Sequence, residues 1–169
     1  DMDEAGFDIQ VLTLSAPSVD IFPVDAGERL ARVVNDEIAE ICRTHPKRFM
    51  AFATLPFLDP DRTLRELERC VGELKFAGAC IGTNINGMGL DDQRLYPFYE
   101  RISEYDLPIH IHPRAPADKE TYRDYRLGPM IGFEVELCVA VVRLVMGGVL
   151  EKFPGLKFIV SHLGGAIPY

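Results

Sequence analysis

Three of the four histidines lie on or beside apolar segments of strand type. His110 and His112 belong to the run PIHIHP, and His162 ends the run LKFIVSH. Side chains alternate along a strand, so His110 and His112 share one face, and Phe158, Val160 and His162 likewise share one. If that face binds ligand, His112 and His162 lie on neighbouring strands at the same rim. Neutral imidazole is both a common metal ligand and the usual general base, so this pair suits a metal ligand and its catalytic partner.

The competing interpretation of a strand histidine is a buried core residue whose polar atoms are hydrogen-bonded. For His112 and His162 the neighbours favour function, because Pro113 stops one strand and Gly164 opens a loop after the other. For His110 we favour the structural role, although a His-x-His pair can itself bind a metal. We interpret His45, which precedes Pro46 at a helix end, as a surface capping residue.

The elements that must position these residues alternate in type along the chain. Short, nearly all-apolar runs, typical of parallel strands covered on both sides, alternate with segments of helical period. We predict a parallel α/β fold with strands over residues 8–15, 49–56, 78–84, 108–113 and 156–162. The clearest helical periods span residues 30–41, 64–71 and 133–144, and a break at Gly147 and Gly148 precedes a short turn over 149–153.

The loops indicate which end of the strands binds ligand. Segments that lead from a helix into a strand are short, whereas those that leave a strand are long and rich in Gly, Pro and Asn. Ligands of α/β proteins bind at the carboxyl ends of the strands, where such loops gather. This is the end at which His112 and His162 are expected.

Size and charge narrow the class of partner. The chain has 169 residues, 47% of them hydrophobic, which suits one domain over residues 1–169. A net charge of −8 argues against nucleic acid or a membrane surface as partner, and favours a small-molecule substrate. The four cysteines lie far apart, as expected of structural thiols in a reducing compartment, and we expect a cytoplasmic protein.

Two long segments carry a family resemblance. They are GTNINGMGLDDQRLYPFYERISEYDLPIHIHP and GFEVELCVAVVRLVMGGVLEKFPGLKFIVSHLGGAIPY, and the opening DMDEAGFDIQVLTLSAP is similar as well. They resemble the amidohydrolase-related (amidohydrolase 2) family, which includes aminocarboxymuconate-semialdehyde decarboxylase and γ-resorcylate decarboxylase. The resemblance implies part of a (β/α)₈ TIM barrel, with the second to sixth strands present. It also implies one divalent metal, zinc as first choice and manganese as the alternative, with His112 as ligand and His162 as catalytic acid/base.

The same resemblance shows what this stretch lacks. The family's first-strand ligands and its aspartate after the eighth strand have no counterpart here, and catalytic zinc needs about three protein ligands. We therefore expect these residues to be a fragment of the enzyme. Resorcylate-type members carry Glu where this chain has Gly165, which suggests the semialdehyde or an unassigned branch. The segment IGTN lacks the lysine that bridges two metals, so a single metal is expected.

The expected activity is non-oxidative decarboxylation of an aromatic or unsaturated carboxylic acid. Arg114 is a candidate partner for the substrate carboxylate, and Asn84 and Asn86 are candidate hydrogen-bond donors. Two alternatives remain open: metal-dependent hydrolysis of a lactone or amide, and a truncated barrel without catalysis. Because exposed strand edges pair with other chains, we expect a homo-oligomer, in the simplest case a dimer.

Overall fold

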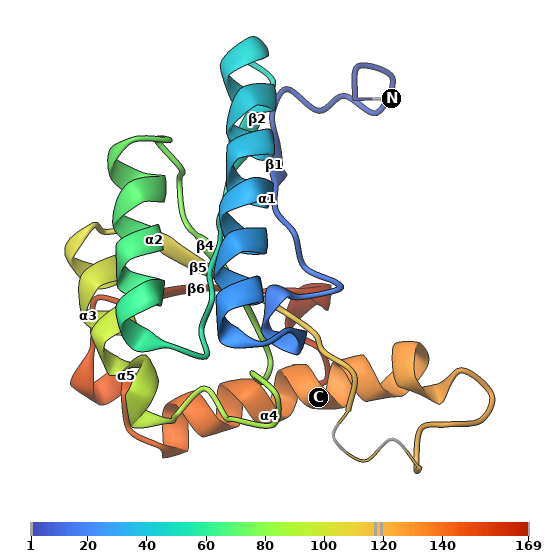
Figure 1. The fold of residues 1–169 in the computed structure, drawn as a ribbon. Helices are drawn as coiled ribbons and strands as arrows, with labels where there is room; N and C mark the ends of the chain where they lie inside the picture. The colour runs from blue at the N-terminus through green and yellow to red at the C-terminus, as the bar shows by residue number, and fades with distance from the viewer. Residues whose placement is uncertain (1, 117, 119, 169) are drawn as a thin grey trace. The chain divides into compact units, whose positions relative to one another are not determined.

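The apolar runs of the sequence form parallel strands, and the segments of helical period form helices between them. The computed structural model describes residues 2–116, 118 and 120–168 (Figure 1). Its strands are β1 (Gln10–Leu12), β2 (Phe49–Ala51), β3 (Ala53–Thr54), β4 (Ala79–Gly82), β5 (Pro108–His112) and β6 (Lys157–Val160). Its α-helices are α1 (Val24–Thr44), α2 (Pro60–Gly72), α3 (Tyr96–Glu104), α4 (Phe133–Met146) and α5 (Val149–Lys152). The prediction of a parallel α/β fold is confirmed.

The second predicted strand is divided in two at Phe52. The backbone before it, β2, pairs with β1, and the backbone after it, β3, pairs with β4. Phe52 N–H donates to the Leu12 carbonyl, whereas Ala53 N–H donates to the Gly78 carbonyl. The run of strand-forming residues is therefore interrupted where its paired strand changes from β1 to β4. The apolar pattern does not show this change.

The chain divides into two compact units, residues up to Cys80 and residues from Ile81 onward. In the first unit α1 packs on β2 and β3. Its buried positions are Gly27, Ala31 and Asn35, whereas Leu30 and Val33 of the predicted apolar stripe are exposed. The small residues allow close approach, since a Cβ at Gly27 would lie 2.9 Å from the Val19 carbonyl oxygen. The organisation as a single domain stays a prediction.

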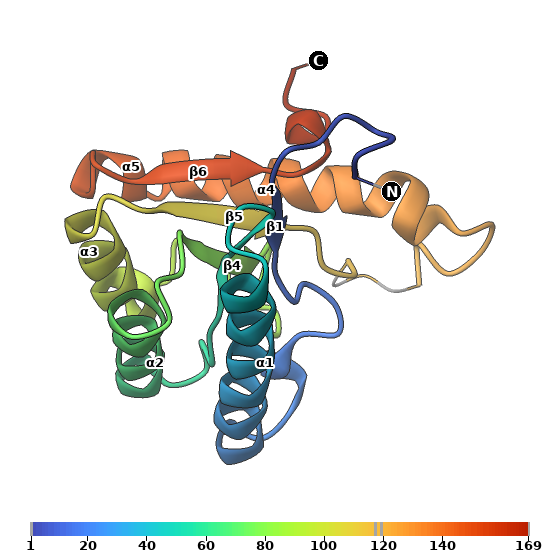
Figure 2. The same ribbon diagram turned by 90° about the horizontal axis from the view of Figure 1, so that it is seen from above.

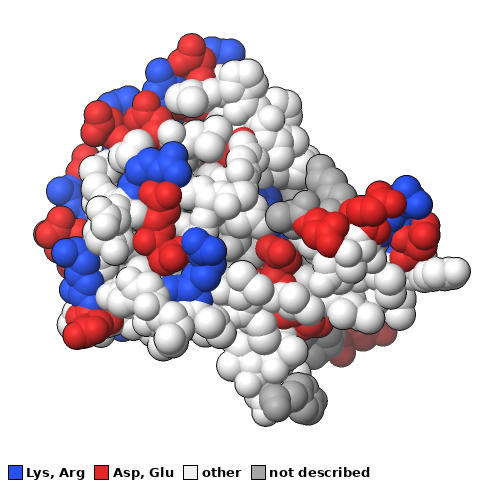
Figure 3. Space-filling model, turned by 90° about the horizontal axis from the view of Figure 1, so that it is seen from below, with Lys and Arg blue, Asp and Glu red and all other residues white. Residues whose placement is uncertain are grey.

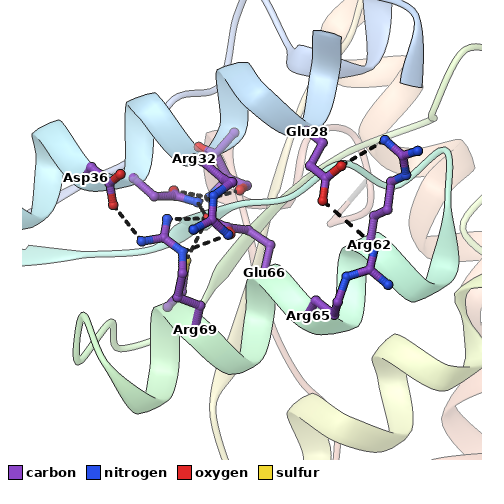
Figure 4. A network of polar contacts seen from close by, with 10 residues as sticks. Glu28, Arg32, Asp36, Arg62, Arg65, Glu66 and Arg69 are labelled. Atoms are coloured by element: carbon purple, nitrogen blue, oxygen red, sulfur yellow. Dashed lines mark hydrogen bonds and ion pairs between the residues drawn. The ribbon is translucent and has the colours of Figure 1, made fainter. Parts of the chain in front are cut away.

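A buried polar network joins α1, β3 and α2 in the first unit (Figure 4). The Asn35 side chain binds both backbone polar groups of Thr54, each at 2.9 Å, and donates to Glu66 Oε1 at 2.8 Å. Glu66, which is 2% exposed, also accepts two hydrogen bonds from Arg69, at 2.6 and 2.9 Å. Arg32 completes the set at 3.2 Å. A buried carboxylate is tolerated here because both of its oxygens are paired.

The second unit is built on β5 and β6, which lie side by side (Figure 2). Ile109 and Ile111 of β5 are fully buried, and the Tyr99 ring of α3 lies 6.3 Å from the Phe158 ring of β6. Burial raises the pKa of Tyr99, whose hydroxyl donates to the Leu90 carbonyl at 2.7 Å. Gly148 takes a left-handed conformation between α4 and α5, which confirms the predicted break.

All four cysteines are free thiols: Cys70 and Cys80 are buried, and Cys42 and Cys138 are partly exposed. Lys and Arg side chains alternate with Asp and Glu on the face shown in Figure 3. Among the described residues, no helix combines the length and apolar character needed to cross a membrane.

Candidate active site

His112 ends β5 with its ring held in one orientation. Its Nδ1 lies 3.0 Å from the carbonyl oxygen of Pro113, so Nδ1 carries the proton when the ring is neutral. Burial lowers the pKa of His112 below its ordinary value of 6.5, and the charges of Arg114 and His162 lower it further, against the opposing effect of the Pro113 hydrogen bond. Nε2 of the neutral ring keeps its lone pair, which is the state that a metal ligand requires.

His110 is half-buried and hydrogen-bonded, which is consistent with the structural interpretation of this residue. Its Nε2 lies 2.9 Å from Ser161 Oγ, and Ser161 Oγ donates its one proton to the Ile111 carbonyl at 2.8 Å. The hydroxyl must then accept from His110, which places the His110 proton on Nε2. Burial, followed by the nearby His112, lowers the pKa of His110. This contact fixes the end of β5 against the residue that precedes His162.

The prediction that His162 shares one strand face with Phe158 and Val160 is wrong, because β6 ends before His162. The register pairs Ile109 with Phe158 and Ile111 with Val160, so those β6 residues share the buried face and not the face of His112. The residue that follows on the His112 face is Ser161. The strand ends at Val160, and His162 takes a left-handed conformation with φ of +51°. The turn, and not strand periodicity, therefore determines where the His162 side chain lies.

The turn brings His162 to the first turn of α4. His162 Nδ1 lies 2.6 Å from Glu134 Oε1, with the two side chains 40% and 31% exposed. His112 ends β5, and His162 lies just beyond the end of the adjacent strand β6; the charge of His162 lowers the pKa of His112. The structure thus brings the two predicted site residues to one end of the β5–β6 pair, as expected.

A second polar cluster surrounds the loop after β4. Thr83 Oγ1 accepts from the Arg114 backbone N–H at 3.0 Å and lies 3.5 Å from Glu136 Oε2. Asn84 Nδ2 donates to the same Glu136 oxygen at 3.0 Å, while Asn84 Oδ1 accepts from Gly87 N–H at 3.0 Å. Both ends of the Asn84 amide are therefore engaged within the protein. Asn86 is exposed in the same loop, with φ of +50°.

Arg114 lies directly over the backbone of Gly82. A Cβ at residue 82 would lie 2.2 Å from Arg114 Nε and 2.8 Å from Arg114 Cγ. Only glycine leaves the space that this side chain occupies, so Gly82 at the end of β4 and Arg114 are matched to each other. Arg114 is half-buried and raises the positive potential around His112, consistent with its effect on the His112 pKa.

Sequence reasoning missed four residues of this region: Thr83, Glu134, Glu136 and Ser161. Thr83 and Ser161 adjoin predicted strand ends, so their position was a usable signal. The two glutamates lie on a predicted helix, but the chain before α4 forms a π-helical turn, η3 (Gly128–Gly132). Because of this turn, the hydrophobic periodicity of the helix does not predict which strand end each glutamate faces.

The donor set fits part of a metal site. Within residues 2–116, 118 and 120–168, no three His, Cys, Asp or Glu side chains come together as a metal-binding group. His112 has the protonation state and orientation of a ligand, and a catalytic zinc centre takes about three protein ligands. His112 would therefore be one member of a larger set.

Comparison with known proteins gives the class to which this fold and site belong. A family model described as Amidohydrolase matches residues 1–168, and the chain belongs to this family. The resemblance noted in the sequence is thereby confirmed, and the parallel α/β structure is part of a TIM barrel of this family.

Among individual relatives, γ-resorcylate decarboxylase from Polaromonas sp. (strain JS666 / ATCC BAA-500) is 38% identical over 99% of this chain and 55% of its own length. The 2-amino-3-carboxymuconate-6-semialdehyde decarboxylase of Dictyostelium discoideum is 36% identical over 87% of this chain and 41% of its own. These identities do not favour the semialdehyde branch that Gly165 suggested. The chain spans about half the length of the curated relatives it matches.

A solved structure agrees with this placement. The crystal structure of dihydroxybenzoic acid decarboxylase from Polaromonas sp. JS666, with bound manganese and the inhibitor 2-nitroresorcinol, superposes with a TM-score of 0.92. It is 37% identical and covers 99% of this chain and 54% of its own chain.

Proposed function

We propose that the natural protein is a metal-dependent lyase that removes carbon dioxide, without oxidation, from an aromatic or unsaturated carboxylic acid. The observation that carries the proposal is the arrangement at the β5–β6 end. There, His112 is neutral and has a free lone pair on Nε2. His162 is accessible at the same end, and its Nδ1 binds Glu134. The decarboxylases among the relatives support the reaction type.

In this proposal the site would hold a single divalent metal, which would supply Lewis-acid polarisation of the substrate oxygens. His112 is one of its ligands. Zinc is the first candidate from the sequence, and the manganese in the Polaromonas structure supports manganese as the second. Metal analysis of the purified natural protein distinguishes the two.

His162 is proposed as the group that moves the proton. Protonated at Nε2, it donates to the ring carbon that bears the carboxylate; the carbon–carbon bond then breaks, and its electron pair restores the unsaturated system as carbon dioxide leaves. Water returns a proton to His162. Because Nδ1 is held by Glu134, Nε2 is the nitrogen available for this exchange.

Recognition of the substrate carboxylate is proposed for Arg114, whose guanidinium group can bind a carboxylate with two parallel hydrogen bonds. Asn86 is a further candidate. Asn84 is the third candidate, and its amide would have to exchange its contact with Glu136 or Gly87 for the substrate. The natural protein is expected to be cytoplasmic and dimeric, and sedimentation of the purified protein tests the oligomeric state.

The test is an incubation of the natural protein, loaded with zinc or manganese, with 2,6-dihydroxybenzoate and related hydroxybenzoates. Carbon dioxide and the decarboxylated phenol are the expected products. Ring opening of a lactone panel, or amide cleavage without carbon dioxide, would replace the proposal by the hydrolase alternative. A protein that binds no metal after dialysis would favour a non-catalytic barrel.

A further inference from the structure

We propose that Glu134 is a positioning residue for His162, which it holds in the Nδ1–H tautomer so that Nε2 can exchange protons. The contact is 2.6 Å between Glu134 Oε1 and His162 Nδ1. The inference rests on the acid/base role proposed for His162. It adds a residue that the sequence patterns did not single out.

The backbone around His162 is built for this contact. The strand register alone would turn the side chain after Ser161 to the face of Ile111 and Val160. Instead, His162 and Leu163 have φ of +51° and +56°, in the left-handed region. A non-glycine residue in that region is strained, and persists where surrounding structure holds it. Here the surrounding structure is the first turn of α4.

Gly165 accounts for the close approach of the turn to α4. Its φ is +64°, and a Cβ there would lie 2.7 Å from the Glu134 backbone oxygen and 3.1 Å from Leu137 Cβ. Glycine therefore meets two requirements at once, the backbone angle and the space. Backbone packing at Gly165 fixes the distance between the turn and the helix, and the Glu134 side chain then reaches the His162 ring.

The chemistry of the pair determines which nitrogen is left for reaction. A carboxylate only accepts hydrogen bonds, so His162 must donate from Nδ1, and the lone pair of the neutral ring is on Nε2. Glu134 is one of two acidic residues in the first turn of α4. Its neighbour Glu136 binds Asn84 instead, so the two acidic residues of this turn serve different partners.

The test compares four forms of the metal-loaded natural protein: the unmodified chain, Glu134→Ala, Glu134→Gln and Glu151→Gln. Glu151 is an exposed acidic residue of α5 and serves as the matched control. ¹⁵N NMR of the histidine rings at about pH 9, above the ordinary histidine range, reports the tautomer. His162→Asn identifies the resonance.

We expect His162 to be protonated at Nδ1 in the unmodified chain, in Glu134→Gln and in Glu151→Gln, because a glutamine oxygen still accepts. In Glu134→Ala the Nδ1–H signal should be lost and kcat should fall about 10-fold or more, with KM within twofold, as for other groups that orient a histidine. Glu134→Gln should recover most of kcat.

Two results would overturn the inference. One is an Nδ1–H tautomer that persists in Glu134→Ala, and the other is an unchanged kcat in that variant despite a changed tautomer. If the unmodified protein releases no carbon dioxide from any acid tested, the proposed function fails. The NMR comparison still decides whether Glu134 sets the tautomer.

Discussion

Nδ1 of His112 donates to the carbonyl oxygen of the next residue, Pro113, at 3.0 Å, and the opposite ring nitrogen is left with its lone pair. Proline is suited to the role of acceptor, because its carbonyl is unaltered while its ring stops the strand at this point. The orientation of the imidazole is thus set by local backbone.

The first prediction concerns His112 as a ligand. In the natural protein, His112→Ala should lower the bound metal per chain, measured by elemental analysis after dialysis, because one of the ligands is removed. His45→Ala is the control, since His45 is an exposed residue at the end of α1. Equal metal content in the two variants would exclude His112 from the site.

The second prediction separates His162 from metal binding. His162→Asn should reduce kcat by roughly 10²- to 10⁴-fold, the range for removal of a general acid or base, while bound metal stays as in the unmodified protein. Initial rates of carbon dioxide release measure the first quantity and elemental analysis the second. Loss of metal together with activity would instead make His162 a ligand.

A third prediction addresses stability in the first unit. Glu66→Gln keeps the side-chain shape but removes the buried carboxylate from Arg69, which keeps only the exposed Asp36 as a charged partner. Loss of these charge-assisted hydrogen bonds should cost about 2 kcal/mol in the free energy of unfolding. Urea denaturation measures the change. Glu40→Gln removes an exposed pair with Arg43 and should leave the free energy of unfolding nearly unchanged. Similar midpoints for the two variants would contradict the role of the network.

The fourth prediction is a titration. Hydrogen bonds from the Arg94 side chain, and then from its backbone N–H, lower the pKa of Asp92 to about 2. A lowered folded-state pKa means that the stabilisation is present above the unfolded value near 4 and is lost as the pH falls towards 2. NMR of the Asp92 carboxyl group should show a midpoint near 2, and Arg94→Ala should move it up towards 4. An unchanged midpoint in the variant would refute the assignment to Arg94.

Much of the fold could be predicted from the pattern of apolar and polar residues along the chain. Apolar runs without alternation correctly indicated parallel strands, and the contrast between short and long loops identified the end that carries His112. The break at Phe52 did not follow, because a change of strand partner leaves no mark on hydrophobicity. In α1, the prediction chose large apolar residues such as Val33, whereas close packing selected Gly27 and Ala31 for the buried side.

In the candidate site, the position of His112 could be predicted from the strand pattern, but the position of His162 could not. His112 lies on a strand, where alternation with a period of two applies up to its last residue. His162 lies one residue beyond Ser161 in a left-handed turn, where that period has already ended. Its helix partner Glu134 depends on the angle at which α4 begins, which is a tertiary property.

The match between Gly82 and Arg114 has a consequence for protein engineering. A mutagenesis library that enlarges or reshapes the substrate site would naturally include residue 82, since it ends a strand near the candidate residues. Any side chain there displaces Arg114 from its place, so a substitution changes two positions of the site in one step. Libraries that hold residue 82 constant and vary the loop after Asn84 should retain a larger fraction of active clones.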